Sequence, residues 1–232
     1  MTGPPADPAL RDMVPQRVLP LVVRIERIES HGPPTRTDAL EAAAIAVLTL
    51  LTDPRTAGGD WADAVREWTD GRIRKVVRRA RGAEWRRGEA LDGLTVTRRT
   101  AQVRAFPPVP LDGWPRDLAR LQVAGTDLDD PEPPPAPEPG VPVLWLNPHL
   151  ELTAGKAMAQ AGHAAQLGWN ALRPADRTAW QEAGFDLAVR TADPDRWAAL
   201  VASDRPLVRD AGFTEVAPWT CTAVADHPAL PG

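Results

Sequence analysis

The chain has 232 residues, of which 43 % are hydrophobic and 25 % charged, and its net charge at pH 7 is -4. This composition is typical of a globular protein and excludes a chain that is disordered throughout. No apolar run approaches the roughly 20 residues needed to cross a bilayer, and the proline-bearing N-terminus lacks the order of a secretory signal. We therefore expect a cytoplasmic protein with no membrane partner.

The single cysteine, Cys221, excludes an internal disulfide and is too little for a zinc site. We expect it to be a small core residue, and we expect neither a metal nor another cofactor. The acidic net charge argues mildly against a nucleic-acid partner. However, the charge is uneven, because residues 72–87 read RIRKVVRRARGAEWRR whereas acidic residues gather at 127–138.

In chain order, residues 1–17 contain four prolines and few apolar groups, which predicts a flexible leader. Residues 18–128 then alternate apolar runs with Ala-rich stretches, as strands and helices do. The expected elements are a strand VLPLVVRIE, a helix DALEAAAIAVLTLL, a helix near 60–70, and strands RKVVRRA, LTVTRR and AQVRAF. We expect these residues to form a first domain.

The segment 129–142 reads DDPEPPPAPEPGVP, so it is almost entirely proline and acid. Such a composition forms neither a helix nor a ladder and predicts a stiff, extended connector. We place the linker at 129–140 and a second domain at 141–232.

The second domain opens with VPVLWL at 141–146, a short apolar run typical of a buried strand. Thr153 can cap the helix that follows, which the Ala-rich residues 154–171 sustain. Further along we expect a helix near 175–183, a strand at 185–192, a helix from 193 to about 203, and two short strands near 206–211 and 220–226. This order predicts an α/β fold in which helices pack on a mixed four-stranded sheet.

Five residues of the first half recur in the second half at a constant shift of 112 positions. Trp68, Val77, Arg78, Ala80 and Trp85 return as Trp180, Val189, Arg190, Ala192 and Trp197. The recurrence predicts a duplicated domain, with an unrelated N-terminal domain as the alternative. Tryptophans spaced in this way within amphipathic elements normally pack inward, so we expect core anchors rather than stacking platforms.

Two polar segments of the second half are candidates for chemistry. Lys156, Gln160 and His163 are spaced i, i+4 and i+7, so they emerge from one face of the predicted helix, whose N-terminal amides are available to an anion. The other segment is DAGFTEVAPWTCT at 210–222, between the last two strands. Taken separately, the first can be a solvated helix face and the second an ordinary turn.

Together, the two segments resemble the type II peptidyl-tRNA hydrolase family. Its pattern is Gly-Lys-x-Ala-Ala-Gln-x-x-His-Ala on the first helix, then Asp-Ala-Gly-Arg-Thr-Gln followed by Pro-Gly-Thr-x-Thr near the end. The residues in register are Gly155, Lys156, Gln160, His163 and Ala164, then Asp210, Ala211, Gly212, Thr214, Pro218, Thr220 and Thr222. The resemblance covers about 141–228 and leaves out the first half, which is then a degenerate copy or an accessory domain.

The resemblance implies hydrolysis of the ester bond of peptidyl-tRNA, with tRNA as the partner. The catalytic candidates are Lys156, Asp210, Thr214 and His163, the last being either a base or a packed structural histidine. In such a reaction Asp210 can orient or deprotonate water, Lys156 can hold a phosphate or the oxyanion, and Thr214 can orient the carbonyl. Gly155, Gln160, Thr220 and Thr222 are expected to line or support the site.

The rim of the expected site departs from the family. Phe213 stands where the family usually has Arg, Glu215 where it has Gln, and Trp219 where it has Gly. These changes remove attraction for phosphate and add repulsion, which favours the alternative of a catalytically weak module that binds tRNA or a protein.

Family members form dimers, so a tandem chain predicts an intrachain pseudo-dimer in which Arg78, Arg79 and their basic neighbours supply phosphate contacts. On a strand such side chains alternate between the two faces, so the bland alternative is that about half of them are simply solvated.

Overall fold

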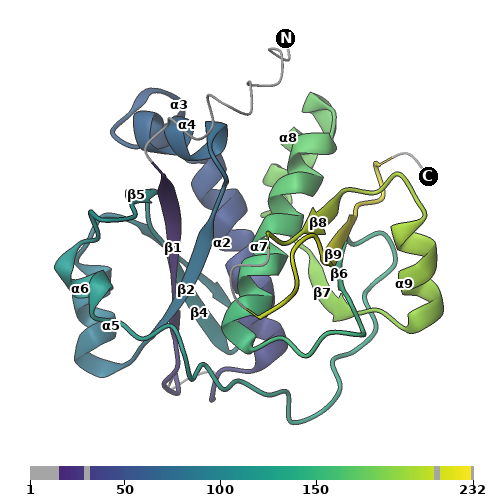
Figure 1. The fold of residues 1–232 in the computed structure, drawn as a ribbon, viewed down its shortest axis with the longest axis horizontal. Helices are drawn as coiled ribbons and strands as arrows, with labels where there is room; N and C mark the ends of the chain where they lie inside the picture. The colour runs from purple at the N-terminus through teal and green to yellow at the C-terminus, as the bar shows by residue number, and fades with distance from the viewer. Residues whose placement is uncertain (1–15, 29–31, 212–214, 231–232) are drawn as a thin grey trace.

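The structure is a computed structural model and describes residues 16–28, 32–211 and 215–230. It shows an α/β protein in which helices pack on two mixed β-sheets (Figure 1). This confirms the expected fold class. Most of the expected leader, residues 1–15, lies outside the described residues.

The first sheet is built from residues of the first half in the order β2-β1-β4-β3. Strand β1 runs parallel to β2 and antiparallel to β4, which pairs in turn with β3; the short strand β5 also pairs with β1. The strands are β1 (Arg17–Arg24), β2 (Lys75–Ala80), β3 (Leu94–Arg98), β4 (Ala101–Ala105) and β5 (Val109–Pro110).

The second sheet repeats this arrangement with the order β7-β6-β9-β8. Strand β6 runs parallel to β7 and antiparallel to β9, and β9 pairs with β8. The strands are β6 (Val143–Leu146), β7 (Ala188–Thr191), β8 (Leu207–Arg209) and β9 (Cys221–Asp226). The two halves therefore have the same strand order and the same strand directions.

The helices follow the same repeat. In the first half they are α2 (Arg36–Thr52), α3 (Pro54–Gly58), α4 (Ala62–Asp70), α5 (Gly82–Glu89) and α6 (Arg116–Ala119); in the second, α7 (Ala154–Ala171), α8 (Pro174–Glu182) and α9 (Pro194–Val201). Helices α2 and α7 each follow the first strand of their sheet, and α5 and α9 each follow the second. The sequence analysis had not predicted α5 within the basic run.

The recurrence at a shift of 112 extends to hydrogen bonds and backbone angles. The Trp68 indole donates to the Arg74 carbonyl at 2.7 Å, and the Trp180 indole donates to the Asp186 carbonyl at 2.9 Å. In each half the residue just before the one that supplies this carbonyl has a positive φ, 40° at Ile73 and 58° at Phe185. Matching local structure at matching positions favours duplication over an unrelated first half.

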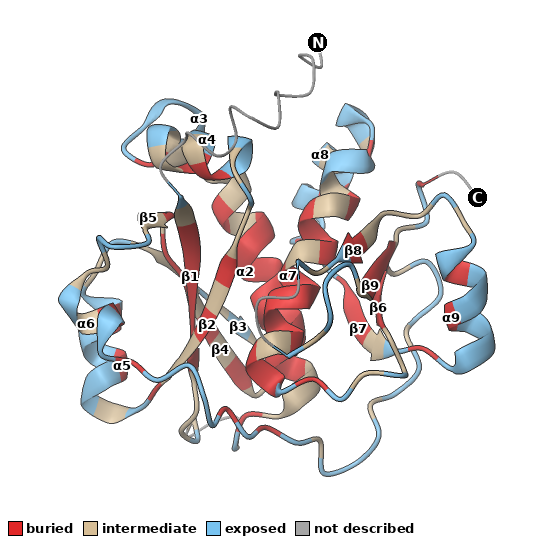
Figure 2. Cartoon of the chain, viewed as in Figure 1, coloured by how far each residue is buried: buried red, intermediate tan, exposed pale blue. Residues whose placement is uncertain are grey.

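The two halves share one hydrophobic core. Helices α2 and α7 pack against each other between the sheets, and buried residues run through both of them (Figure 2). The close approach depends on small side chains: a Cβ atom at Gly162 would lie 3.0 Å from Val47 Cγ2. The linker thus separates two sheets along the chain, but each sheet depends on the other half for its burial.

Charged groups also join the halves. Glu41, on α2, is fully buried and binds Arg98 and Arg99 of the first half at 3.1 and 2.9 Å, and Arg190 on β7 at 2.8 Å. The linker is held to this region, because Asp130 accepts hydrogen bonds from Thr37. Residues 129–140 contain no helix or strand, and Asp130 anchors them to the first half.

The expected tryptophan anchors are confirmed: Trp61, Trp68, Trp85, Trp180 and Trp197 are buried, and Trp169 packs against the core. Cys221 is half-buried on β9. Among the described residues, no helix combines the length and the apolar character needed to span a membrane.

Candidate active site

The site begins at the N-terminus of α7. Thr153 caps the helix, its hydroxyl accepting from the Lys156 amide at 3.3 Å. The same threonine binds Glu215, through its hydroxyl at 2.7 Å and its backbone N–H at 3.0 Å. A carboxylate is stabilised at a helix N-terminus, so Glu215 occupies the position that the sequence analysis had left for an outside anion. The contact between Thr153 and Glu215 is not among those that the sequence predicts.

Lys156 reaches from the first turn of α7 to Asp210, which follows β8. The Lys156 Nζ atom lies 2.6 Å from Asp210 Oδ2, and the two side chains are only 12 % and 10 % exposed. Asp210 is fixed by its backbone as well, since its N–H donates to the Thr220 carbonyl at 2.9 Å and its carbonyl accepts from the Trp219 N–H at 2.6 Å. Two of the three groups expected to converge therefore do so. The third, Thr214, lies outside the described residues.

A chain of hydrogen bonds supports Asp210 from inside the protein. The Gln160 amide donates to Asp210 Oδ2 at 2.8 Å, and the hydroxyl of Thr222 on β9 donates to Gln160 Oε1 at 2.5 Å. Gln160 and Thr222 are buried. They therefore orient the carboxylate and do not line the surface of the site.

His163 binds a residue of the first half. It follows Lys156 and Gln160 along α7, where this helix packs against β2. The His163 Nδ1 atom is 3.2 Å from the Nζ atom of Lys75, which donates to Gln166 Oε1 at 2.6 Å. His163 therefore makes a contact across the interface between the halves, whereas Lys156 and Gln160 of the same stripe bind Asp210.

Burial lowers the pKa of Lys75 well below its ordinary value. Burial, reinforced by the charges of Lys75 and Lys156, also holds the pKa of His163 well below its ordinary value. A neutral imidazole accepts a hydrogen bond from the ammonium, whereas a charged one repels it. The contact with Lys75 therefore favours a neutral His163.

The remaining candidates of the second half have local roles. A Cβ atom at Gly155 would meet Val77 and Thr126 of the first half, each at 3.8 Å, so this glycine faces the interface and does not line the site. The Thr220 hydroxyl donates to the Ala217 carbonyl at 2.7 Å within its own turn. Neither residue is placed to contact a substrate through its side chain.

Arg78 and Arg79 use their donors inside the protein. Arg78 donates to the Leu121 carbonyl at 2.5 Å and lies over the Trp114 ring at 4.3 Å. Arg79 donates to the Ala124 carbonyl at 3.0 Å and to the Gln122 side chain. Both residues fix the segment 119–124, so their charge remains but much of their hydrogen-bonding capacity is used.

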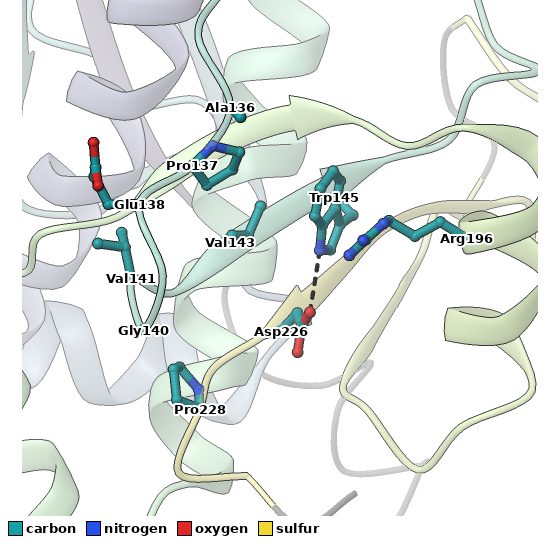
Figure 3. A pocket seen from close by; sticks show the side chains of 10 residues that line it. All are labelled: Ala136, Pro137, Glu138, Gly140, Val141, Val143, Trp145, Arg196, Asp226 and Pro228. Carbon is teal, nitrogen blue, oxygen red and sulfur yellow. Dashed lines mark hydrogen bonds between the residues drawn. The ribbon is translucent and has the colours of Figure 1, made fainter.

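An open pocket of about 410 Å³ lies elsewhere, between the linker, β6 and α9 (Figure 3). Arg196 stacks over the Trp145 ring at 4.5 Å, and the Trp145 indole donates to Asp226 at 3.2 Å. None of the residues lining this pocket belongs to the Lys156–Asp210 site. In the described part of the chain, no three His, Cys, Asp or Glu side chains gather as a metal site would require.

The comparisons with known proteins add no assignment to this geometry. Neither a scan against models of known protein families nor a search of curated protein sequences finds a match to this chain.

Proposed function

We propose that this chain hydrolyses the ester bond between a peptide and tRNA at the Lys156–Asp210 pair. The observation that carries the proposal is the 2.6 Å contact between these two groups, which lie far apart in the sequence and both match the family pattern. Gln160 and Thr222, which also match the pattern, support the same carboxylate from behind. Two pattern residues thus bind the Asp210 carboxylate directly, and a third, Thr222, supports it through Gln160.

The chemistry follows from the two charges. Water attacks the ester carbonyl carbon, the bond from that carbon to the ribose oxygen breaks, and the proton lost by water passes to the ribose oxygen. Asp210 accepts the proton and delivers it, while the ammonium of Lys156 donates to the oxyanion that forms in between. When Lys156 turns from Asp210 to the substrate, Gln160 still holds the carboxylate in place.

The test is release of a labelled N-blocked amino acid from tRNA by the purified protein. We expect Lys156→Ala and Asp210→Asn each to lower kcat by about a hundredfold or more, the usual scale for losing a proton-transfer group or an oxyanion donor. Retention of tRNA on a filter without any release, or full activity in both variants, would contradict the proposal.

A second candidate is a binding module without hydrolysis. It is favoured by the direct contact itself, because Lys156 and Asp210 can neutralise each other as a purely structural ion pair. In that case both variants lower stability, and the wild-type protein binds tRNA or a protein without releasing any amino acid.

A further inference from the structure

Trp219 has an unfavourable conformation for a tryptophan. Its φ is 65°, in the left-handed region that favours glycine, and its side chain is 73 % exposed. Among the other large apolar residues of the described chain, the most exposed is Val123 at 53 %. A left-handed backbone costs stability for a residue with a Cβ atom, and an indole left in water gains nothing from burial. Glycine, the residue of the family pattern at this position, avoids the backbone strain.

The other large residues with positive φ have their side chains held by the protein. Phe185 is buried in the core and Ile73 packs against it, while Arg99 binds two carboxylates. No described residue stacks on the Trp219 ring. The fold therefore carries a strained residue whose side chain adds nothing to the core.

The backbone of Trp219 is paired with that of Asp210, the proposed catalytic residue. Its N–H donates to the Asp210 carbonyl at 2.6 Å, and the next residue, Thr220, accepts from the Asp210 N–H at 2.9 Å. These two bonds tie the backbone of Trp219 to that of Asp210. An exposed indole is therefore attached to backbone that pairs directly with Asp210.

We propose that Trp219 is a stacking platform for an unpaired base at the 3′ end of the tRNA substrate, next to the ester that is cleaved. This rests on the proposed function, because a tRNA ester is carried by the terminal, unpaired nucleotide. Aromatic side chains bind single-stranded nucleic acid by stacking, which needs little positive charge. The chain has a net charge of -4, and its Arg78 and Arg79 donate to backbone carbonyls of the segment 119–124. A stacking contact suits such a chain, because it does not depend on these arginines.

The experiment compares two small esters of the same N-blocked amino acid, one on adenosine and one on a base-free ribose. For Trp219→Gly we expect kcat/KM on the adenosine ester to fall about tenfold, chiefly through KM, with no change on the base-free ester. Trp219→Phe should restore most of the loss. Because glycine relieves the backbone, Trp219→Gly should also raise Tm, so unfolding cannot explain its lower activity.

A second measurement separates this proposal from the proposed function. Binding of a short labelled RNA ending in CCA is followed by fluorescence anisotropy in the wild type and in Trp219→Gly. If wild-type protein cleaves both esters and Trp219→Gly changes neither cleavage nor binding, stacking is overturned and the hydrolase stands. If nothing is cleaved but the RNA binds about tenfold more weakly to Trp219→Gly, the hydrolase fails and stacking stands. If the wild-type protein cleaves neither ester and Trp219→Gly binds the RNA as tightly as the wild type does, both the hydrolase and the stacking proposal are overturned.

Discussion

The first turns of α2 and α7 hold equivalent residues of opposite charge. Asp38 lies three residues after the cap Thr35, and Lys156 lies three residues after the cap Thr153. Asp38 reaches the connection between β3 and β4, and Lys156 reaches the equivalent connection between β8 and β9. Asp38 binds Arg99 at 3.1 Å, whereas Lys156 binds Asp210 at 2.6 Å. The scaffold is repeated, and the polarity of the ion pair is reversed.

The connection that each side chain meets differs in length between the two halves. In the first half, a tight turn joins β3 to β4, and Thr100 donates to Asp38 through its hydroxyl at 2.6 Å and its N–H at 3.1 Å. Although burial raises the pKa of Asp38, hydrogen bonds from Thr100 and Arg99 hold it below its usual range. In the second half, eleven residues from 210 to 220 join the strands. In the first half, the short turn holds Asp38 with hydrogen bonds from Thr100. In the second half, the longer connection carries Asp210, which pairs with Lys156 at the proposed site.

The largest effect on stability is expected from the carboxylate that joins the halves. Glu41→Gln leaves three arginines without their buried partner, so we expect unfolding to become about 3 kcal/mol easier. Urea denaturation measures the change. The control is Asp63→Asn, which removes a pair whose aspartate is 80 % exposed and should cost no more than about 0.5 kcal/mol. Equal effects in the two variants would show that Glu41 does not hold the halves together.

The support behind Asp210 should influence chemistry more than binding. Gln160→Leu removes the donor that holds the carboxylate when Lys156 turns to the substrate, so we expect kcat to fall about tenfold with KM little changed. Steady-state hydrolysis of N-blocked aminoacyl-tRNA gives both constants. Gln181→Leu, on the exposed side of α8, is the matched control and should leave them unchanged. A change in KM alone would assign Gln160 to binding.

The smallest effect is a pH dependence of stability. The folded-state pKa of His163 is lowered. As the pH drops below roughly 6.5, His163 therefore takes up a proton in the unfolded chain but not in the folded chain. Stability is therefore fully present above that pH and is lost below it. His163→Gln keeps an acceptor for Lys75 and should reduce the loss between pH 7 and 5 by about 1 kcal/mol. His149→Gln, at an exposed position, should leave the loss of stability between pH 7 and 5 unchanged. If the two variants lose the same stability over this range, His163 is not the group responsible.

Local patterns predicted most of the elements and part of the site. Alanine-rich sequence between Thr153 and Pro174 predicts a helix at 154–171, and α7 spans those residues. The helix α5 was missed because its glycines and the surrounding arginines hide the apolar period. The side chains of Lys156, Gln160, Thr222 and Asp210, which the resemblance selects, are connected by hydrogen bonds in the structure.

Contacts made by the packing of one half on the other could not be predicted in this way. His163 continues the stripe of Lys156 and Gln160 in sequence, but its partner Lys75 comes from β2 of the other half. Glu215 is likewise bound by a residue 62 positions away. Only the arrangement of the two halves in space decides such pairs.

The most direct test makes the same substitution at the two sites, Asp210→Asn and Asp38→Asn, and measures hydrolysis of N-blocked aminoacyl-tRNA beside the free energy of unfolding. Asp210→Asn should lower hydrolysis about a hundredfold or more and leave the protein folded. Asp38→Asn should lower stability by about 1 to 2 kcal/mol and keep the rate per folded molecule. Equal rates in the two variants, or an unaltered rate in Asp210→Asn, would contradict a catalytic role for the second-half pair.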